Sequence, residues 1–272
     1  MFSASKTAAA PSGYQIANSL RFRSSASAYL NRTFSAGNQK TWTWSGWVKR
    51  GTLSADEQLF SQGTGPSANG YASIGFQSDN TFVIFGSPNN VVDSIVWSST
   101  AVFRDCSAWY HVCAVLDTTQ ATGSNRFKLY VNGTQQSGTF STTPSLNANI
   151  EINRAASHQI AVINSANTFL RFFDGYMAEV NFIDGQALTP SSFGQFNATT
   201  GVWQPIKYTG TYGTNGFHLN FSNGTSTTTL GYDSSGNNNN WTTNNISLTA
   251  GSTYDWMLDS PTPYAGSSYG VG

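Results

Sequence analysis

Charged residues are scarce in this 272-residue chain, where Asp, Glu, Lys and Arg make up only 10 % of the sequence. The 13 basic and 13 acidic side chains cancel, so there is no overall basic field to attract nucleic acid. No hydrophobic run approaches the ~18 residues of a membrane span, and the first residues lack the basic and apolar segments of a signal peptide. We therefore expect no nucleic-acid binding, no membrane insertion and no export through a signal peptide.

The chain also has few cysteines and shows little helical periodicity. The chain has two cysteines, Cys106 and Cys113, and a chain of this length can bury a core without a disulfide. Cys113 lies in an apolar run, where a free thiol behaves as a small hydrophobic group, although a disulfide between the two stays open. Apolar residues alternate with polar ones between clusters of Gly, Asn, Asp and Ser, which is typical of an all-β sandwich or barrel.

Three tryptophans fall within six residues of the stretch TWTWSGWVKR, residues 41–50. In a strand, Trp42 and Trp44 point to one face and Trp47 points to the other. The first two are predicted to belong to the core. Trp47 has two interpretations, packing beneath a loop or stacking on a sugar.

Other segments predict strands and turns with equal clarity. The stretch YASIGFQSDNTFVIFG, residues 71–86, predicts a hairpin with its turn at residues 78–80. The stretch WYHVCAVLD, residues 109–117, is apolar on both faces and predicts a central strand that is covered on both sides. Asn132 and Gly133 supply the two positive-φ positions of a type I′ hairpin turn.

Six segments, in this order, resemble the laminin-G-like jelly roll, which shares the concanavalin-A-like sandwich with pentraxins and legume lectins. They are SLRF…AYL (19–30), WTWSGWVKRG (42–51), QLFSQG (58–63), WYHVCAVLD (109–117), FKLYVNG (127–133) and FDGYMAEVNFIDGQALTP (173–190). The resemblance covers about residues 19–190 and implies an all-β, two-sheet antiparallel jelly-roll sandwich with one concave sheet. We expect an N-terminal arm over residues 1–18 and a loop-rich C-terminal extension over residues 191–272, which packs on the sandwich or on a neighbouring subunit.

Residues 173–262 are also similar to laminin-G-like modules in virion proteins of tailed phages, especially marine phages. The similarity lies in FDGYMAEVNFIDGQALTP together with the later segments DSSGNNNNWT and YDWMLDSPT. It implies a virion location and a role in capsid decoration, a head fibre or a tail fibre. Other virion proteins and further copies of this chain are then the expected partners.

Paired acids and metal-site spacings are missing from the strands. The related glucanases resemble one another in carrying paired acids along one strand, and a glycosidase needs two carboxyl groups about 5–9.5 Å apart. Glu57, Glu151 and Glu179 have no second acid two to four residues away, and Asp56 and Glu57 are adjacent, so they point to opposite faces. The three histidines lack the spacing of a zinc site. We expect that the protein is not an enzyme.

Calcium is the one metal for which the sequence offers candidate ligands, and no other cofactor is expected. The turn from Asp233 to Asn237 resembles an Asp-x-Ser-Gly-Asn turn that can contribute oxygen ligands in laminin-G-like domains. Asp174 is a third candidate, although calcium needs six to eight oxygen ligands. The alternative is an Asx turn that holds no metal.

The C-terminal tryptophans are candidates for a binding surface, because an aromatic ring on a polar segment needs another surface to bury it. They are Trp203, Trp241 and Trp256, and together with Trp47 they are the predicted ligand-binding residues. The sequence thus favours a non-catalytic virion structural protein that acts through protein–protein contacts. The alternative is a lectin-like receptor-binding module for host or environmental glycans, with or without calcium.

Overall fold

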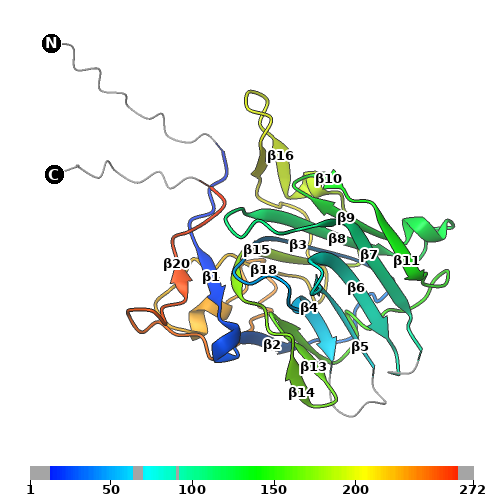
Figure 1. The fold of residues 1–272 in the computed structure, drawn as a ribbon, viewed down its shortest axis with the longest axis horizontal. Helices are drawn as coiled ribbons and strands as arrows, with labels where there is room; N and C mark the ends of the chain where they lie inside the picture. The colour runs from blue at the N-terminus through cyan, green and yellow to red at the C-terminus, as the bar shows by residue number, and fades with distance from the viewer. Residues whose placement is uncertain (1–12, 64–69, 90–91, 263–272) are drawn as a thin grey trace.

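The computed structural model describes residues 13–63, 70–89 and 92–262 and shows two β-sheets packed face to face (Figure 1). Sheet A consists, in spatial order, of β10 (Thr134–Gln135), β9 (Phe127–Val131), β8 (Tyr110–Asp117), β3 (Thr41–Arg50), β15 (Gly175–Asp184), β1 (Ser19–Phe22) and β20 (Trp256–Met257), and β18 (Phe217–Leu219) also pairs with β15. Sheet B consists of β11 (Gly138–Thr142), β7 (Ile95–Val102), β6 (Thr81–Ser87), β5 (Tyr71–Phe76), β4 (Glu57–Gly63), β12 (Ser157–Ile160), β2 (Tyr29–Thr33) and β19 (Thr242–Asn244). Neighbouring strands pair antiparallel. The predicted two-sheet sandwich is confirmed.

Short elements complete the fold. Two small hairpins are formed by β13 (Ile163–Ser165) with β14 (Thr168–Leu170), and by β16 (Gly194–Phe196) with β17 (Trp203–Pro205). The 3-10 turns are η1 (Ser24–Ala26), η3 (Gly123–Asn125), η4 (Pro190–Ser192) and η5 (Thr228–Gly231). Among the residues described, no helix has the length and apolar character needed to cross a membrane.

The tryptophans of strand β3 lie on the two faces that the sequence predicts. Trp42 and Trp44 are fully buried between the sheets, whereas Trp47 lies on the opposite face of sheet A and is 5 % exposed. A Cβ atom at Gly46 would lie only 2.9 Å from the ring of Trp44, so the missing side chain makes room for that ring. The core role predicted for Trp42 and Trp44 is confirmed.

The predicted central strand and hairpin turn are also present. Strand β8 lies between β3 and β9, and its residues 111–116 are all buried. Between β9 and β10 the φ angles of Asn132 and Gly133 are 48° and 77°, as a type I′ turn requires. The two free cysteines are Cys106, half-buried, and Cys113, which is fully buried in β8.

The C-terminal part of the chain completes the sandwich. It adds β18 and β20 to sheet A and β19 to sheet B. Phe217 and Trp241 enter the core, where their rings lie 4.9 Å apart and pack against Phe60 of sheet B. These aromatic residues are therefore buried by the sandwich itself, whereas the predicted boundaries between arm, sandwich and extension stay a prediction.

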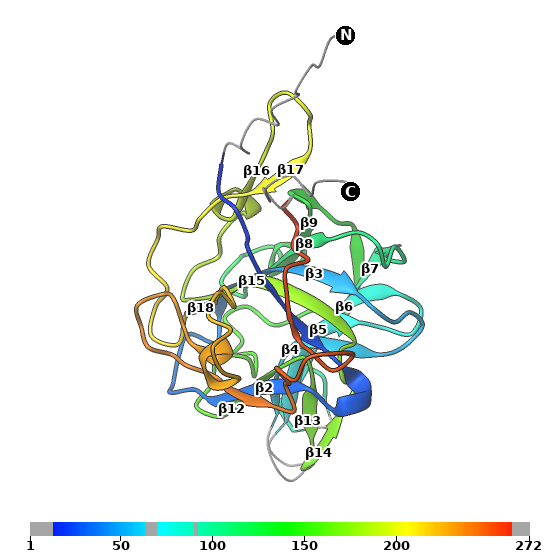
Figure 2. The same ribbon diagram turned by 90° about the vertical axis from the view of Figure 1, so that its left-hand side faces the viewer.

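Both ends of the described chain meet beside β1, as Figure 2 shows in blue and red. The fully buried carboxylate of Asp255 forms ion pairs with Arg21 at 3.1 Å and Arg23 at 2.7 Å. The hydroxyl of Thr262 accepts the N–H of Ile16 at 3.0 Å and donates to its carbonyl at 2.8 Å. A buried carboxylate with two guanidinium partners holds this end of the chain in place.

Candidate functional site

A groove of about 320 Å³ crosses the outer face of sheet B over β4, β5 and β6. Its described lining consists of Asp56, Gln58, Tyr71, Ser73, Gln77, Ser78, Val83, Phe85 and Arg171. We call it the sheet-B groove. It combines aromatic, hydroxyl and amide groups, and its volume lies at the lower end of the range for ligand pockets.

Strand register explains why these side chains meet. Gln58 pairs with Gly75, which pairs with Val83, and Ser73 pairs with Phe85 on the next strand. All of them therefore point to the outer face. A Cβ at Gly75 would lie 2.1 Å from the carbonyl oxygen of Glu57 and 2.9 Å from Oε1 of Gln58, so the glycine leaves space for the main chain of β4 and for this amide at the floor of the groove.

Tyr71 and Phe85 form one wall of the sheet-B groove. Their ring centroids lie 5.1 Å apart with an angle of 24° between the planes, and both residues are half-buried. Aromatic side chains that keep part of a ring accessible can pack against the apolar face of a ligand. This wall is the accessible apolar element of the groove.

Two polar side chains at the floor lack a partner. Gln58 and Ser73 are each 1 % exposed, and neither Oε1 of Gln58 nor Oγ of Ser73 has a hydrogen-bond partner. A buried polar atom without a partner costs about 1–3 kcal/mol. The groove therefore carries an unused acceptor and an unused hydroxyl.

One ion pair lies at the rim of the groove. Nε of Arg171 lies 3.6 Å from Oδ2 of Asp56, and both side chains are well exposed, at 45 % and 39 %. The other carboxylate oxygen of Asp56 accepts the N–H of Ser78 at 2.9 Å. Arg171 has a φ of 56°, a conformation that costs a non-glycine residue about 1–2 kcal/mol, and its carbonyl accepts the N–H of Gln58 at 3.0 Å.

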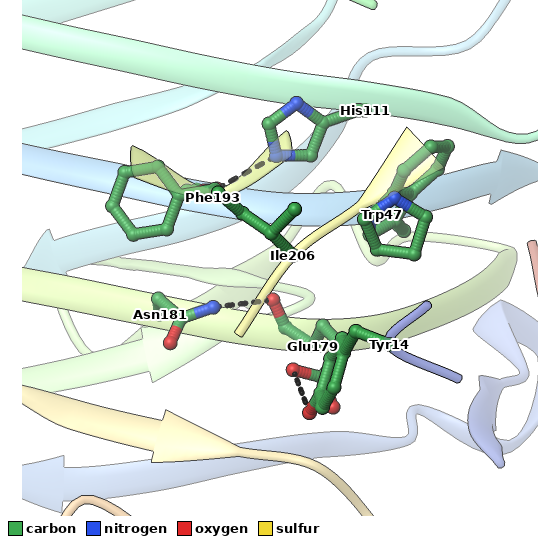
Figure 3. A pocket seen from close by; sticks show the side chains of 9 residues that line it. Tyr14, Trp47, His111, Glu179, Asn181, Phe193 and Ile206 are labelled. Carbon is green, nitrogen blue, oxygen red and sulfur yellow. Dashed lines mark hydrogen bonds between the residues drawn. The ribbon is translucent and has the colours of Figure 1, made fainter. Parts of the chain in front are cut away.

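The outer face of sheet A holds a second polar cluster, which Figure 3 shows from close by. A β-bulge in β15 gives Glu179 a φ of 49°. Its Oε2 accepts the hydroxyl of Tyr14 at 3.0 Å and lies 2.7 Å from Nε2 of His218. Burial, followed by the charge of Glu179, raises the pKa of Tyr14, so this hydroxyl stays a donor at neutral pH.

A serine and a histidine meet in the same cluster. Oγ of Ser45 lies 2.9 Å from Nε2 of His111, but Nδ1 of His111 has no partner, whereas a catalytic triad places a carboxylate there. Burial lowers the pKa of His111 to about 3, so the ring is neutral at pH 7. The adjoining cavity measures about 10 Å³, which is about the space of one water molecule, so it does not hold a substrate.

A third hollow lies at one side of the sandwich, and we call it the edge groove. Its volume is about 330 Å³, and it lies between the edge strands β10 and β11 of the two sheets. Trp97, Phe127 and Phe140 provide its apolar lining. Trp97 and Phe127 are 4 % and 2 % exposed, and Phe140 is half-buried, so Phe140 is the ring of this apolar lining that stays partly accessible.

The similarity of this chain to known proteins concerns its family and its fold. A laminin-G-type family model described as the concanavalin A-like lectin/glucanases superfamily matches residues 22–193. The chain belongs to this superfamily. No curated protein matches its sequence.

Several solved structures resemble this superfamily member. The heptameric SAP-like pentraxin of Limulus polyphemus is 19 % identical over 65 % of this chain and 80 % of its own, with a TM-score of 0.47. A candidate carbohydrate-binding protein of Bacteroides ovatus is 16 % identical over 85 % of this chain and 59 % of its own, with a TM-score of 0.51. A sialidase carbohydrate-binding module of Ruminococcus gnavus, solved with α2,3-sialyllactose, is 11 % identical over 59 % of this chain and 85 % of its own, with a TM-score of 0.41. At these identities, the likeness concerns the fold.

The tryptophans predicted as ligand-binding residues lie elsewhere in this concanavalin A-like sandwich. Trp47 and Trp203, which are 5 % and 9 % exposed, pack around His111 on the outer face of sheet A. Trp241 is 3 % exposed in the core. Trp256 is half-buried, and its Nε1 donates to the carbonyl of Phe221 at 2.8 Å. Their role in binding stays a prediction, to which their burial adds no support.

Two of the predicted calcium ligands, Asp233 and Asn237, lie in one turn, whereas Asp174 directly precedes β15. The carboxylate of Asp233 accepts backbone N–H groups of His218, Ser235 and Asn239, each at 2.8 Å. The side-chain amide of Asn237 donates to the carbonyls of residues 213 and 216. Asp174 accepts the hydroxyl of Ser24 at 2.7 Å. In the described part of the chain no three His, Cys, Asp or Glu side chains gather as a metal site, and calcium binding stays a prediction.

The sheet-B groove was missed by reasoning from sequence. Its residues lie in segments that were assigned to strands, namely QLFSQG and the hairpin of residues 71–86. The available signal was a set of small or amide side chains, Gln58 in one strand and Ser73 and Gly75 at alternating positions of the next. Such positions indicate the solvent face of a sheet.

Proposed function

We propose that this protein is a non-catalytic carbohydrate-binding module that holds a glycan in the sheet-B groove. The observation that carries the proposal is the pair of unpartnered polar atoms, Oε1 of Gln58 and Oγ of Ser73, beside the aromatic wall. Sugar hydroxyls can supply the missing hydrogen-bond partners, and the apolar face of a sugar ring can pack on Tyr71 or Phe85. Membership in a lectin and glucanase superfamily supports this assignment.

The floor requires a small adjustment when the ligand binds. Gln58 and Ser73 are each 1 % exposed, so a sugar hydroxyl reaches them after a change of side-chain rotamer. Rotamer changes at a binding site are common while the backbone stays in place. The strands β4 and β5 thus act as a rigid frame, and the side chains supply the adaptation.

A glycan array probed with the full chain tests the proposal, with Tyr71→Ala as the informative variant. We expect binding by the natural protein and about a tenfold loss of affinity, roughly 1.4 kcal/mol, in the variant. Tyr232→Ala is the control, because Tyr232 is 47 % exposed and does not line the sheet-B groove. An array without any signal, or equal losses in both variants, would contradict the proposal.

A structural role on a phage particle is the second candidate, and it rests on the similarity of residues 173–262 to phage virion proteins. One structural observation favours it: Ile16 and Thr262 are hydrogen-bonded, so both ends of the described chain would approach one neighbouring subunit from the same place. Quantitative mass spectrometry of purified particles tests this role. A copy number that matches the capsid lattice supports decoration, and a few copies in multiples of a fibre's symmetry support a fibre. Absence from the particles refutes both.

A further inference from the structure

Charge in the sheet-B groove is balanced. Among its described lining residues the charged side chains are Asp56 and Arg171, and they form an ion pair with each other at 3.6 Å. A carboxylated sugar needs a cation that is free to accept it, and the fork of an arginine is the natural partner. Here, the one arginine is already next to a carboxylate.

Hydrogen bonds hold the carboxylate of Asp56 and the main chain of Arg171 in place. The N–H of Ser78 donates to the carboxylate of Asp56 at 2.9 Å. The carbonyl of Arg171 accepts the N–H of Gln58 at 3.0 Å, which ties the arginine to the floor of the groove. An anionic ligand that approached Arg171 would therefore meet the negative charge of Asp56 at the same point, and like charges repel.

We propose that the Asp56–Arg171 pair makes the sheet-B groove selective for neutral glycans over acidic ones. The inference rests on the proposed function and names the class of sugar that the groove accepts. Neutral sugars need only the hydroxyl and amide groups of Ser73 and Gln58 and the aromatic wall. Acidic sugars, such as sialic acid or uronic acids, are repelled by Asp56 and find no free cation to bind.

The variant Asp56→Asn separates charge from structure. Asn retains the Oδ1 atom that accepts the N–H of Ser78, but it removes the negative charge and leaves Arg171 free to pair with a sugar carboxylate. The double variant with Arg171→Gln removes that cation again. Asp79→Asn is the matched control, because Asp79 lies in the adjacent turn, accepts hydrogen bonds from Thr81 and does not line the groove.

The experiment uses the full chain and immobilised glycan pairs that differ only by an acidic sugar. Suitable pairs are lactose with α2,3-sialyllactose, and xylotetraose with its glucuronic-acid-substituted form. We expect the natural protein to prefer the neutral member of each bound pair at least tenfold. In Asp56→Asn the preference should shrink to parity or reverse, and the new binding should weaken with added salt, because exposed charges are screened. The double variant should lose this new binding and keep the neutral ligand.

The outcomes distinguish a failure of the proposed function from a failure of the selectivity. If the natural protein binds no member of any pair, the proposed function fails, and the selectivity fails with it. If the natural protein binds acidic members equally well or better, the module stands and the selectivity is refuted. An unchanged preference in Asp56→Asn, or the same change in Asp79→Asn, also refutes the selectivity alone.

Discussion

Two serines that face each other across β4 and β5 allow a sharp test of the sheet-B groove. Ser61 and Ser73 are cross-strand partners on the outer face, and both are 1 % exposed or less. The hydroxyl of Ser61 lies 3.0 Å from Oε1 of Gln159 and 2.7 Å from the carbonyl of Val162. The hydroxyl of Ser73 has no partner. Replacement of Ser61 by alanine should therefore destabilise the fold, whereas replacement of Ser73 should not.

The structure sets the size of the difference. Ser61→Ala leaves buried acceptors unpaired and should lower the free energy of unfolding by about 1–3 kcal/mol. Ser73→Ala removes a hydroxyl that is already unpaired, so the free energy of unfolding should stay within about 0.5 kcal/mol of the natural value or rise. Because a ligand supplies the missing partner, Ser73→Ala should also weaken glycan binding about fivefold, roughly 1 kcal/mol.

Urea denaturation at pH 7 measures the first effect, and titration with the best ligand from the glycan array measures the second. A loss of stability in Ser73→Ala as large as that in Ser61→Ala would refute the reasoning, because the hydroxyl would then have a structural partner. Unchanged glycan affinity in Ser73→Ala would remove this hydroxyl from the binding site.

Other parts of the molecule give further predictions. Acid should destabilise the fold: Nε2 of His158 accepts the N–H of Asn153, and burial lowers the pKa of this histidine to about 3. The unfolded chain takes up this proton near pH 6.5, so the contribution of neutral His158 to the free energy of unfolding is complete above pH 6.5 and falls by about 2 kcal/mol at pH 5. A midpoint of thermal unfolding that stays constant between pH 5 and 8 would contradict this. Asp255→Asn should lower the free energy of unfolding by about 2 kcal/mol, because the buried carboxylate loses its ion pairs with Arg21 and Arg23, whose side chains are each 20 % exposed. An unchanged midpoint of guanidinium chloride denaturation would contradict this. Burial raises the pKa of Cys113, so a thiol reagent should label it only after unfolding, and rapid labelling of the native protein would be the opposite result.

The strands that sequence reasoning predicted best are those with an unambiguous pattern. Alternation of Trp42 and Trp44 with polar residues fixed which face of β3 enters the core. The two positive φ angles at Asn132 and Gly133 follow from residues that tolerate them. In each case a few adjacent residues contain the whole physical cause, so no knowledge of distant contacts is needed.

The sheet-B groove could not be predicted in the same way, because it depends on pairing between strands. A bulge between Gln58 and Phe60 adds a residue to β4, and a shift of one residue exchanges the two faces of a strand. The ion pair at the rim joins Asp56 to Arg171, and these residues are far apart in the sequence. The alternation of apolar and polar residues within one strand predicts neither the bulge nor this contact.

The C-terminal region shows a different limit. Its polar composition predicted long loops, and side chains hold loop backbone by hydrogen bonds, as at Asp233, whose carboxylate accepts three backbone N–H groups. Trp241 lies in the core beside Phe217 rather than on a surface. A lone aromatic residue in a polar segment indicates that something buries it, but the sequence does not say whether the same chain does so.

Crystals of the full chain with the best neutral oligosaccharide from the glycan array provide the most direct test of the central claim. We expect a sugar ring against Tyr71 or Phe85, with a hydroxyl within about 3 Å of Oε1 of Gln58 or Oγ of Ser73. Sugar that binds only in the edge groove or on the outer face of sheet A would contradict it.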